Sequence, residues 1–141
     1  MAQIRPYREP DRDAVLALWE VCGLTRPWNP PAADIAFLRA SGHGELLVAA
    51  DGDQVVGTVM VGHDGHRGWV YYMAVDPARQ RQGFGTRLLR AAEAWAAACG
   101  VRKLELMIRE SNAAAATFYA RCGYGTEPVT VMSRWLKPAE A

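Results

Sequence analysis

The sequence has little that would place the chain in a membrane, in a secretory pathway or on nucleic acid. No apolar run approaches the roughly 20 residues needed to span a bilayer, and residues 1–7 hold no apolar signal-peptide core. The formal net charge is only +1, whereas a dedicated nucleic-acid binder usually carries a clear basic excess. We therefore expect a cytoplasmic protein whose partners include neither a membrane nor a nucleic acid.

Cysteine is also scarce, and its spacing suits neither a disulfide framework nor a metal site. The three cysteines are odd in number and lack the spacing of metal ligands: Cys22, Cys99 and Cys122. Each is followed directly by glycine, the residue that most often ends a helix in the left-handed conformation. The pattern predicts three helix ends and no metal cofactor.

Repeats, linkers and low-complexity segments are absent. Half of the residues are apolar, which excludes a disordered chain. A length of 141 residues is enough for one domain with its own core. We therefore expect residues 1–141 to form a single domain.

Alternation and helical spacing predict a mixed α/β domain. Strands are expected at residues 3–7, 45–50, 54–63, 69–75, 101–108 and 129–136. Helices are expected to begin at Asp11 or Asp13, near Ala33, at Thr86, and at Ser111 or Asn112. The turn at residues 51–53, Asp-Gly-Asp, predicts a hairpin between two of the strands.

A glycine-punctuated turn lies between the strand at 69–75 and the long helix after it. Residues 79–85 read Arg-Gln-Arg-Gln-Gly-Phe-Gly. Backbone N–H groups at a helix start have no partner within the helix, and the helix dipole adds partial positive charge there. Arg79, Arg81 and Arg87 add formal charge. The turn predicts a site for a phosphorylated ligand, although Leu88 stands where a dinucleotide fold would have its third glycine.

Two motifs, in the correct order and separation, make the chain resemble the GCN5-related N-acetyltransferases, the GNAT family. The family's Arg/Gln-x-x-Gly-x-Gly/Ala turn is matched by residues 80–85. Its second element, Asn-x-x-Ala-x-x-Phe-Tyr followed by Gly-Tyr/Phe, is matched by Asn112, Ala115, Phe118, Tyr119, Gly123 and Tyr124. The turn at 62–68 and the loop at 24–29 further resemble the YpeA-like branch of this family.

The resemblance implies a fold and a reaction. The fold would be a mostly antiparallel sheet of six to seven strands, with splayed fourth and fifth strands, flanked by about four helices. Acetyl-coenzyme A (acetyl-CoA) would donate the acetyl group directly to a primary amine of a small molecule, protein or peptide. A catalytically weak CoA-binding regulatory module is the alternative. Family members often form homodimers, and the last predicted strand, which carries Trp135, could supply the contact.

The resemblance also assigns the residues that bind the donor. Met73 and Val75, with Ala74 between them, would pair their main chain with the pantetheine amides, as an added strand would. Backbone amides of the turn would hold the pyrophosphate, from Arg81, Gln82, Gly83, Phe84, Gly85 and Thr86. Asn112 would cap its helix and also contact the cofactor arm.

Tyr119 is the predicted general acid. It shares a helix face with Ala115, Phe118 and Cys122, so it should point inward. A buried tyrosine hydroxyl needs a hydrogen-bond partner. The resemblance implies that this partner is the CoA sulfur and that Tyr119 protonates the departing thiolate. A core tyrosine bonded to the backbone is the alternative.

The general base is the open question, because an amine is largely protonated at about pH 7. Two positions where family members carry a glutamate hold none: residues 69–72 read Trp-Val-Tyr-Tyr, and the second position is Met107. Glu105 lies on the same strand face as Met107 and is the predicted base, acting through water. The remaining candidates are loop residues: His66, Asp64 and Glu110.

The acceptor is expected to meet two segments of the chain. Arg26 and Trp28 lie in the proline-rich loop between the first two helices, and they could grip a carboxylate or a planar group. His66 and Tyr71 would border the cleft on another side, and Tyr71 with Tyr72 could line a water chain. Either segment could instead be purely structural.

Overall fold

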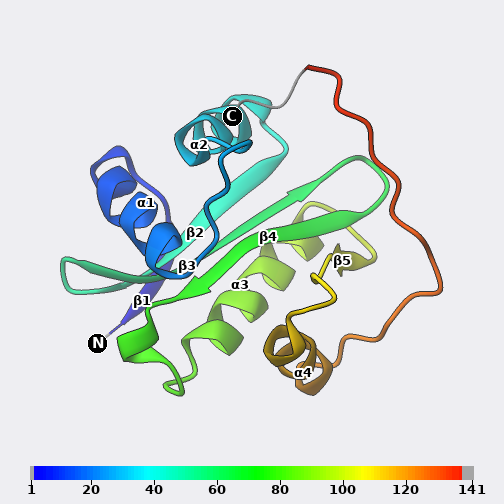
Figure 1. The fold of residues 1–141 in the computed structure, drawn as a ribbon. Helices are drawn as coiled ribbons and strands as arrows, with labels where there is room; N and C mark the ends of the chain where they lie inside the picture. The colour runs from blue at the N-terminus through cyan, green and yellow to red at the C-terminus, as the bar shows by residue number, and fades with distance from the viewer. Residues whose placement is uncertain (1, 138–141) are drawn as a thin grey trace.

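The computed structural model describes residues 2–137 (Figure 1). Its strands are β1 (Gln3–Pro6), β2 (Gly44–Asp51), β3 (Gln54–His63), β4 (Gly68–Val75) and β5 (Leu104–Leu106). Its helices are α1 (Arg12–Val21), α2 (Pro31–Ser41), α3 (Phe84–Ala98) and α4 (Ala113–Arg121), with 3-10 turns η1 (Glu9–Asp11) and η2 (Pro77–Arg79). None of the helices within residues 2–137 has the length and apolar character required to cross a bilayer.

One sheet organises the chain, in the order β1-β2-β3-β4-β5. The first four strands pair antiparallel, and β5 lies parallel to β4. This confirms the predicted mixed fold, its mostly antiparallel sheet and its four flanking helices. The glycines that follow Cys22, Cys99 and Cys122 all have left-handed backbones, which confirms the three helix ends.

The sheet has five strands within residues 2–137, so the expectation of six to seven is wrong. The segment predicted as a strand at 129–136 is irregular. Alternating apolar residues indicate strand propensity, but a strand also needs a hydrogen-bonding neighbour. This segment has none in the sheet, and Met132 and Leu136 are 91% and 93% exposed.

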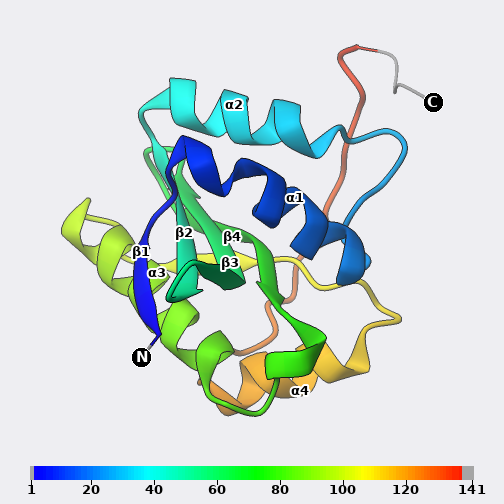
Figure 2. The same ribbon diagram turned by 90° about the vertical axis from the view of Figure 1, so that its left-hand side faces the viewer.

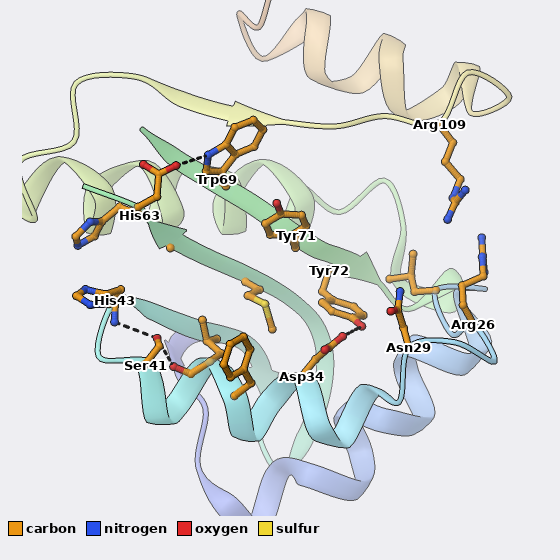
Figure 3. A pocket seen from close by; sticks show the side chains of 16 residues that line it. Arg26, Asn29, Asp34, Ser41, His43, His63, Trp69, Tyr71, Tyr72 and Arg109 are labelled. Atoms are coloured by element: carbon orange, nitrogen blue, oxygen red, sulfur yellow. Dashed lines mark hydrogen bonds between the residues drawn. The ribbon is translucent and has the colours of Figure 1, made fainter. Parts of the chain in front are cut away.

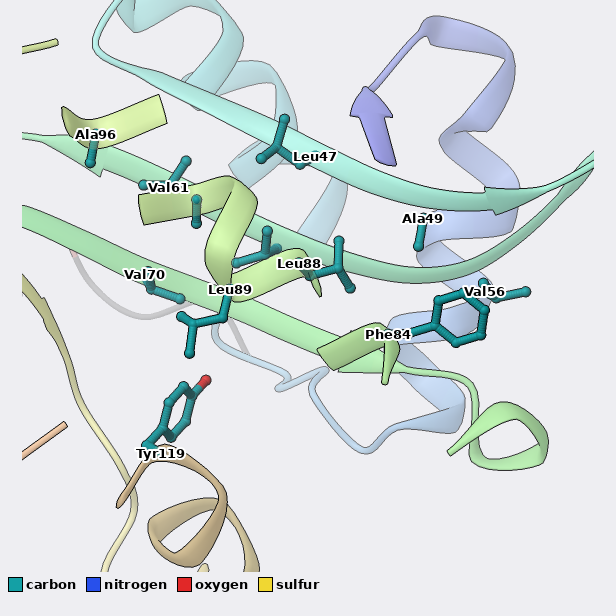
Figure 4. Close-up of a cluster of buried hydrophobic side chains, with 12 residues drawn as sticks. Leu47, Ala49, Val56, Val61, Val70, Phe84, Leu88, Leu89, Ala96 and Tyr119 are labelled. Carbon is teal, nitrogen blue, oxygen red and sulfur yellow. The ribbon is translucent and has the colours of Figure 1, made fainter. Parts of the chain in front are cut away.

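Helices cover both faces of the sheet (Figure 2). α1 and α2 pack on one face, where Val15, Trp19 and Ile35 meet the sheet. α3 and α4 pack on the other face, where Leu88 and Leu89 of α3 are fully buried (Figure 4). The spacing of apolar residues on α3 places them on one side of the helix. The sheet is therefore the middle of three layers, and β4 and β5 lie on the side of the sheet opposite β1.

β4 and β5 stay together over only three residue pairs, which end at Val70 opposite Leu106. β4 continues to Val75, and no described strand pairs with that part of its β5-facing edge. The predicted splay of the fourth and fifth strands is therefore confirmed. It leaves main-chain groups of β4 open on one side, next to α4.

A bulge in β4 lies beside the splay. The register between β3 and β4 shifts between Thr58 and Met60, and Tyr72 has a left-handed backbone with φ of 52°. A non-glycine residue in this region is strained and needs support from its surroundings. The Trp19 indole Nε1 donates to the Thr58 hydroxyl at 2.8 Å, and that hydroxyl donates to the Tyr72 carbonyl at 2.8 Å. This buried chain of hydrogen bonds holds the bulge in place.

Candidate active site

The turn before α3 has the backbone of an anion site. Arg81 and Gly83 both have left-handed backbones, with φ of 64° and 82°, and Gly83 is the residue that caps the helix. Alternating backbone conformations of this kind gather N–H groups into a concave surface. The N–H groups of the first turn of α3 also lack acceptors within the helix. These features fit the predicted pyrophosphate site at residues 81–86.

Glycine is required at two positions of this turn, for different structural reasons. Gly83 needs its positive φ, and a Cβ atom there would meet nothing within 4 Å. Gly85 is instead required by close packing, because a Cβ atom at this position would lie only 3.3 Å from the ring of Phe118. Gly85 therefore lets α3 pack closely on α4.

The three arginines near the turn differ in their availability. Arg79 pairs with Asp51 across 2.5 Å, and Arg87 donates to the carbonyl of Ala2 at 3.0 Å. Arg81 is exposed, and its side chain forms no hydrogen bond or ion pair among residues 2–137. Arg81 is thus the arginine of this group that is best placed to meet a phosphate.

Met73, Ala74 and Val75 form the end of β4 beyond the splay. Met73 and Val75 pack toward α3 and α4, while Ala74 packs on the opposite face. One edge of this stretch pairs with β3, as Ala74 opposite Thr58 and Val75 opposite Gly57. The other edge can accept an extended ligand by strand addition. This geometry fits the predicted pantetheine site.

Tyr119 reaches the same place from α4. It is 8% exposed, and its hydroxyl is directed toward Leu89 and Val70 (Figure 4). Burial raises the pKa of Tyr119 to about 12. Within residues 2–137 the hydroxyl forms no hydrogen bond, so the alternative of a backbone-bonded core tyrosine finds no partner. Asn112 caps α4 as predicted, since its Oδ1 accepts from Ala115 N at 3.1 Å, while its contact with the cofactor stays a prediction.

A cavity of about 700 Å³ lies on the other face of the sheet, beside the bulge (Figure 3). α2, the loop after α1, the β3–β4 hairpin and the loop after β5 all contribute to its wall. Successive side chains of a regular strand point to opposite faces, yet Tyr71 and Tyr72 both line this cavity. The left-handed backbone of Tyr72 accounts for the difference.

Asp34 is the carboxylate at the centre of this cavity. It accepts a hydrogen bond of 2.6 Å from the Tyr72 hydroxyl. Burial and this bond both raise the pKa of Tyr72, so Tyr72 stays protonated at neutral pH. Asp64 also lines the cavity, but it is engaged by its own turn. Bonds from the backbone of Arg67 and His66 lower the pKa of Asp64 to about 2.

The predicted acceptor residues are partly brought together. Arg26 and Tyr71 line the cavity, whereas Trp28 and His66 do not. Asn29 N donates to Arg26 O at 3.0 Å, which makes Trp28 a central residue of a tight turn and leaves it 41% exposed. His66 is exposed at the tip of the β3–β4 hairpin.

Glu105, the predicted base, lies on β5 outside the cavity wall. Its nearest cation is Arg67, with Nε and Oε1 3.9 Å apart. Lys103, two residues before Glu105, pairs with Glu127 at 2.5 Å. Nothing in this arrangement directs the Glu105 carboxylate to the centre of the cavity.

Sequence reasoning missed Asp34 and Arg109, which both line the cavity. A signal existed for Asp34, because Asp34, Leu38 and Ser41 share one face of α2 and all three face the cavity. For Arg109 there was none, since it lies in an irregular loop after β5. No group of three metal-binding side chains occurs among residues 2–137.

Comparison with known proteins agrees with this geometry. The profile of the acetyltransferase (GNAT) family matches residues 12–124. An acetyltransferase from Pectobacterium atrosepticum is 38% identical over 139 residues, which are 98% of this chain and 99% of the relative. An acetyltransferase from Yersinia enterocolitica is 38% identical over 134 residues, 95% of each chain. The finer resemblance to the YpeA-like branch stays a prediction.

Solved structures share the fold at low identity. An aminoglycoside acetyltransferase from an uncultured soil sample, in complex with sisomicin, matches with a TM-score of 0.81 and 20% identity over 96% of this chain and 97% of that chain. An aminoglycoside N-acetyltransferase in complex with CoA matches with a TM-score of 0.82 and 14% identity over 97% of this chain and 96% of that chain. Because the family profile spans most of the sequence and the relatives align over nearly all of it, the chain belongs to the GNAT family and is an N-acetyltransferase, in a family whose enzymes use acetyl-CoA.

Proposed function

We propose that this protein moves the acetyl group of acetyl-CoA directly to a primary amine held in the cavity. One observation carries the proposal: the open edge of β4 and the cavity meet at the bulge of the same strand. Tyr71 and Tyr72 line the cavity, and the residues that follow them form the splayed edge. A donor along that edge and an acceptor in the cavity would approach each other at the bulge.

The donor side supplies position and a proton. Bound acetyl-CoA would bring a thioester carbonyl to the bulge. Main-chain groups of Met73 and Val75 would hold the pantetheine arm, and the amides of residues 81–86 would hold the pyrophosphate. Tyr119 Oη would give its proton to the departing thiolate. Its pKa of about 12 ensures that the proton is present at neutral pH.

On the acceptor side, Asp34 is better placed than Glu105 to serve the amine. An ammonium group in the cavity would pair with the Asp34 carboxylate, which already accepts from Tyr72. We propose that Asp34 takes the amine's proton, directly or through water. Glu105 lies outside the cavity wall, 3.9 Å from Arg67, and could act only through a longer water relay.

The protein is also proposed to form a homodimer in the cytoplasm. Residues 127–137 lie outside the sheet and carry exposed apolar side chains, including Trp135 at 60% and Leu136 at 93%. The outer edge of β5 has no neighbouring strand among residues 2–137. A second copy could cover these side chains and extend the sheet at this edge.

A thiol-release assay with acetyl-CoA tests the reaction. The enzyme is incubated with a broad panel of amines, and each acetylated product is identified by mass spectrometry. The proposal predicts acetyl transfer to at least one amine class and tight binding of CoA measured by calorimetry. Tight CoA binding without transfer to any amine would favour the alternative of a regulatory CoA-binding module.

A further inference from the structure

We infer that the acceptor is a small amine that also carries an oxyanion, a carboxylate or a phosphate, bound by Arg26 and Arg109. This inference rests on the proposed function, because it names the class of amine that fills the cavity. The evidence for it is the set of charged side chains on the cavity wall and the order in which they lie along the cavity.

Two guanidinium groups face each other at one end of the cavity. Arg26 comes from the loop after α1, Arg109 comes from the loop after β5, and their side chains point toward one another (Figure 3). Neither forms an ion pair with a carboxylate among residues 2–137. Facing cations repel each other unless an anion lies between them. The fork of donors on each guanidinium is suited to a carboxylate or phosphate.

The two arginines differ in how firmly their side chains are held by the rest of the protein. Arg26 is fixed by its Nη1, which donates to the carbonyls of Gly23 at 2.8 Å and Thr25 at 2.9 Å. Its remaining N–H groups are available to a ligand. Arg109 forms no side-chain hydrogen bond or ion pair among the described residues, so all five of its donors are available. One arginine is thus held in place and the other can close on the ligand.

A negatively charged group, the Asp34 carboxylate, lines the same cavity as the two arginines. Asp34 and Tyr72 occupy the middle of the cavity, and Asn29 lies between them and the arginines (Figure 3). A ligand with an ammonium group at Asp34 would therefore direct its other end toward Arg26 and Arg109. This order matches an amine that bears an oxyanion.

The size and the walls of the cavity favour a small molecule. About 700 Å³ falls within the range of small-ligand pockets. Phe37, Trp69 and Tyr71 give the wall aromatic surface. The two arginines oppose amines that carry only positive charge, such as polyamines and aminoglycosides, since each would bring further cations to an end that is already cationic.

Matched pairs of ligands test this inference by binding. We would titrate the CoA-bound enzyme calorimetrically with amines that differ only in the oxyanion: 4-aminobutyrate with butylamine, L-phenylalanine with 2-phenylethylamine, and phosphoethanolamine with ethanolamine. The inference predicts that oxyanion-bearing members bind at least about tenfold more tightly, as expected for one charge-assisted contact. Whichever arm binds more tightly distinguishes a carboxylate from a phosphate ligand.

A variant links the preference to the arginines. Arg109→Gln should abolish most of the preference without weakening the binding of amines that lack an oxyanion or of CoA. Arg102→Gln is the matched control, because Arg102 is exposed before β5 and lies outside the cavity wall. Equal loss in both variants would overturn the inference, as would amines without an oxyanion that bind as well as their oxyanion-bearing partners.

The binding readout separates the two proposals. If no amine is acetylated but oxyanion-bearing amines still bind through Arg109, the proposed reaction fails and the ligand class stands. If amines without an oxyanion are acetylated efficiently and Arg109→Gln changes nothing, the reaction stands and the ligand class fails.

Discussion

At the residue scale, the proposed chemistry depends on two hydroxyl groups and one carboxylate that come from different elements. Tyr119 belongs to α4, Tyr72 to the bulge of β4, and Asp34 to α2. Tyr119 lies with the α3 side of the sheet, while Asp34 and Tyr72 lie with the cavity on the opposite side. Tyr119 can therefore be altered without touching Asp34 and Tyr72, which are hydrogen-bonded to each other.

Replacing Tyr119 by phenylalanine removes the proposed acid and keeps the ring packed. We expect turnover to fall about 100-fold or more, with CoA affinity within about twofold of wild type because the proposed pyrophosphate and pantetheine contacts are left intact. Tyr124→Phe is the matched control, since that hydroxyl is already engaged by Glu93 at 2.6 Å. Unchanged turnover in Tyr119→Phe would remove the acid role.

The pH dependence of turnover follows from the same residue. An acid must be protonated to act, and burial raises the pKa of Tyr119 from its ordinary value to about 12. The protonated fraction therefore stays near one up to about pH 10, where an ordinary tyrosine would already be half ionised. We expect no alkaline decline from Tyr119 below that pH in initial-rate measurements. A decline centred at or below it, and absent in Tyr119→Phe, would contradict this.

Asp34→Asn tests the proposed base. The amide can still accept the hydrogen bond from Tyr72, but it cannot take a proton or balance an ammonium group. We expect kcat/KM for the amine to fall about 100-fold, with CoA affinity unchanged, in steady-state kinetics. Asp13→Asn, on the exposed side of α1, is the control and should retain full activity. If Asp34→Asn behaves like this control while Glu105→Gln is inactive, Glu105 is the base.

Residue-scale prediction from sequence succeeded where a residue's role follows from its helix position. Asn112 as a cap and Tyr119 as an inward residue both follow from spacing along α4. Asp34 and Arg109 could not be found in this way, because their proximity depends on how α2 and the loop after β5 meet across the sheet. That meeting is a tertiary arrangement, which local periodicity does not encode.

At the scale of elements, the bulge of β4 determines where donor and acceptor would meet. The sequence predicted the strand but not the bulge, because its cause lies in Trp19 and Thr58 on two other elements. Thr58 is fully buried, and its hydroxyl accepts one hydrogen bond and donates another. The strained backbone of Tyr72 therefore depends on a residue far from it in sequence.

Thr58→Val tests this support at nearly constant volume. The substitution leaves the Trp19 N–H and the Tyr72 carbonyl without their partner, which costs on the order of 2 kcal/mol of unfolding free energy or more. Chemical denaturation measures the loss, and a parallel assay should show reduced turnover as the bulge relaxes. Thr58→Ser keeps the hydroxyl and should restore most of both. If Thr58→Val is as stable and active as wild type, the hydroxyl does not hold the bulge.

The turn before α3 offers a second test at this scale. Gly83→Ala forces a side chain into a left-handed backbone, which costs about 1–2 kcal/mol, and it should weaken CoA binding at least severalfold as the turn adjusts. Gly125→Ala is the control, because Gly125 has open space and no positive φ. Calorimetric titration with CoA measures the effect. Wild-type affinity in Gly83→Ala would contradict the assignment of the pyrophosphate to this turn.

At the scale of the whole molecule, the mixed fold and its four flanking helices were predicted better than the number of strands. Residues 101–108 were expected as a strand, but only Leu104–Leu106 pairs, because β5 leaves β4 after Leu106. Residues 129–136 have the alternation of a strand, but they pair with no strand of the sheet that residues 2–137 form. The sequence of such a segment shows its propensity to form a strand, but its pairing depends on whether a neighbouring strand is available.

The proposed dimer makes this dependence measurable. Sedimentation equilibrium of the wild-type protein should give twice the mass of one chain, because association would cover the exposed apolar side chains of residues 127–137. Trp135→Ser combined with Leu136→Ser should shift the protein to monomers. Val21→Ser, at a 67% exposed position on α1, should not. A wild-type protein that is monomeric at all concentrations would overturn the dimer.

The most direct test of the account is a crystal structure with CoA and an oxyanion-bearing amine bound together. We expect the pantetheine arm along Met73–Val75, the CoA sulfur within hydrogen-bond distance of Tyr119 Oη, and the amine nitrogen beside Asp34 in the cavity. An amine bound outside the cavity, or a CoA sulfur remote from both Tyr119 and the bulge, would contradict the claim that the two substrates meet there.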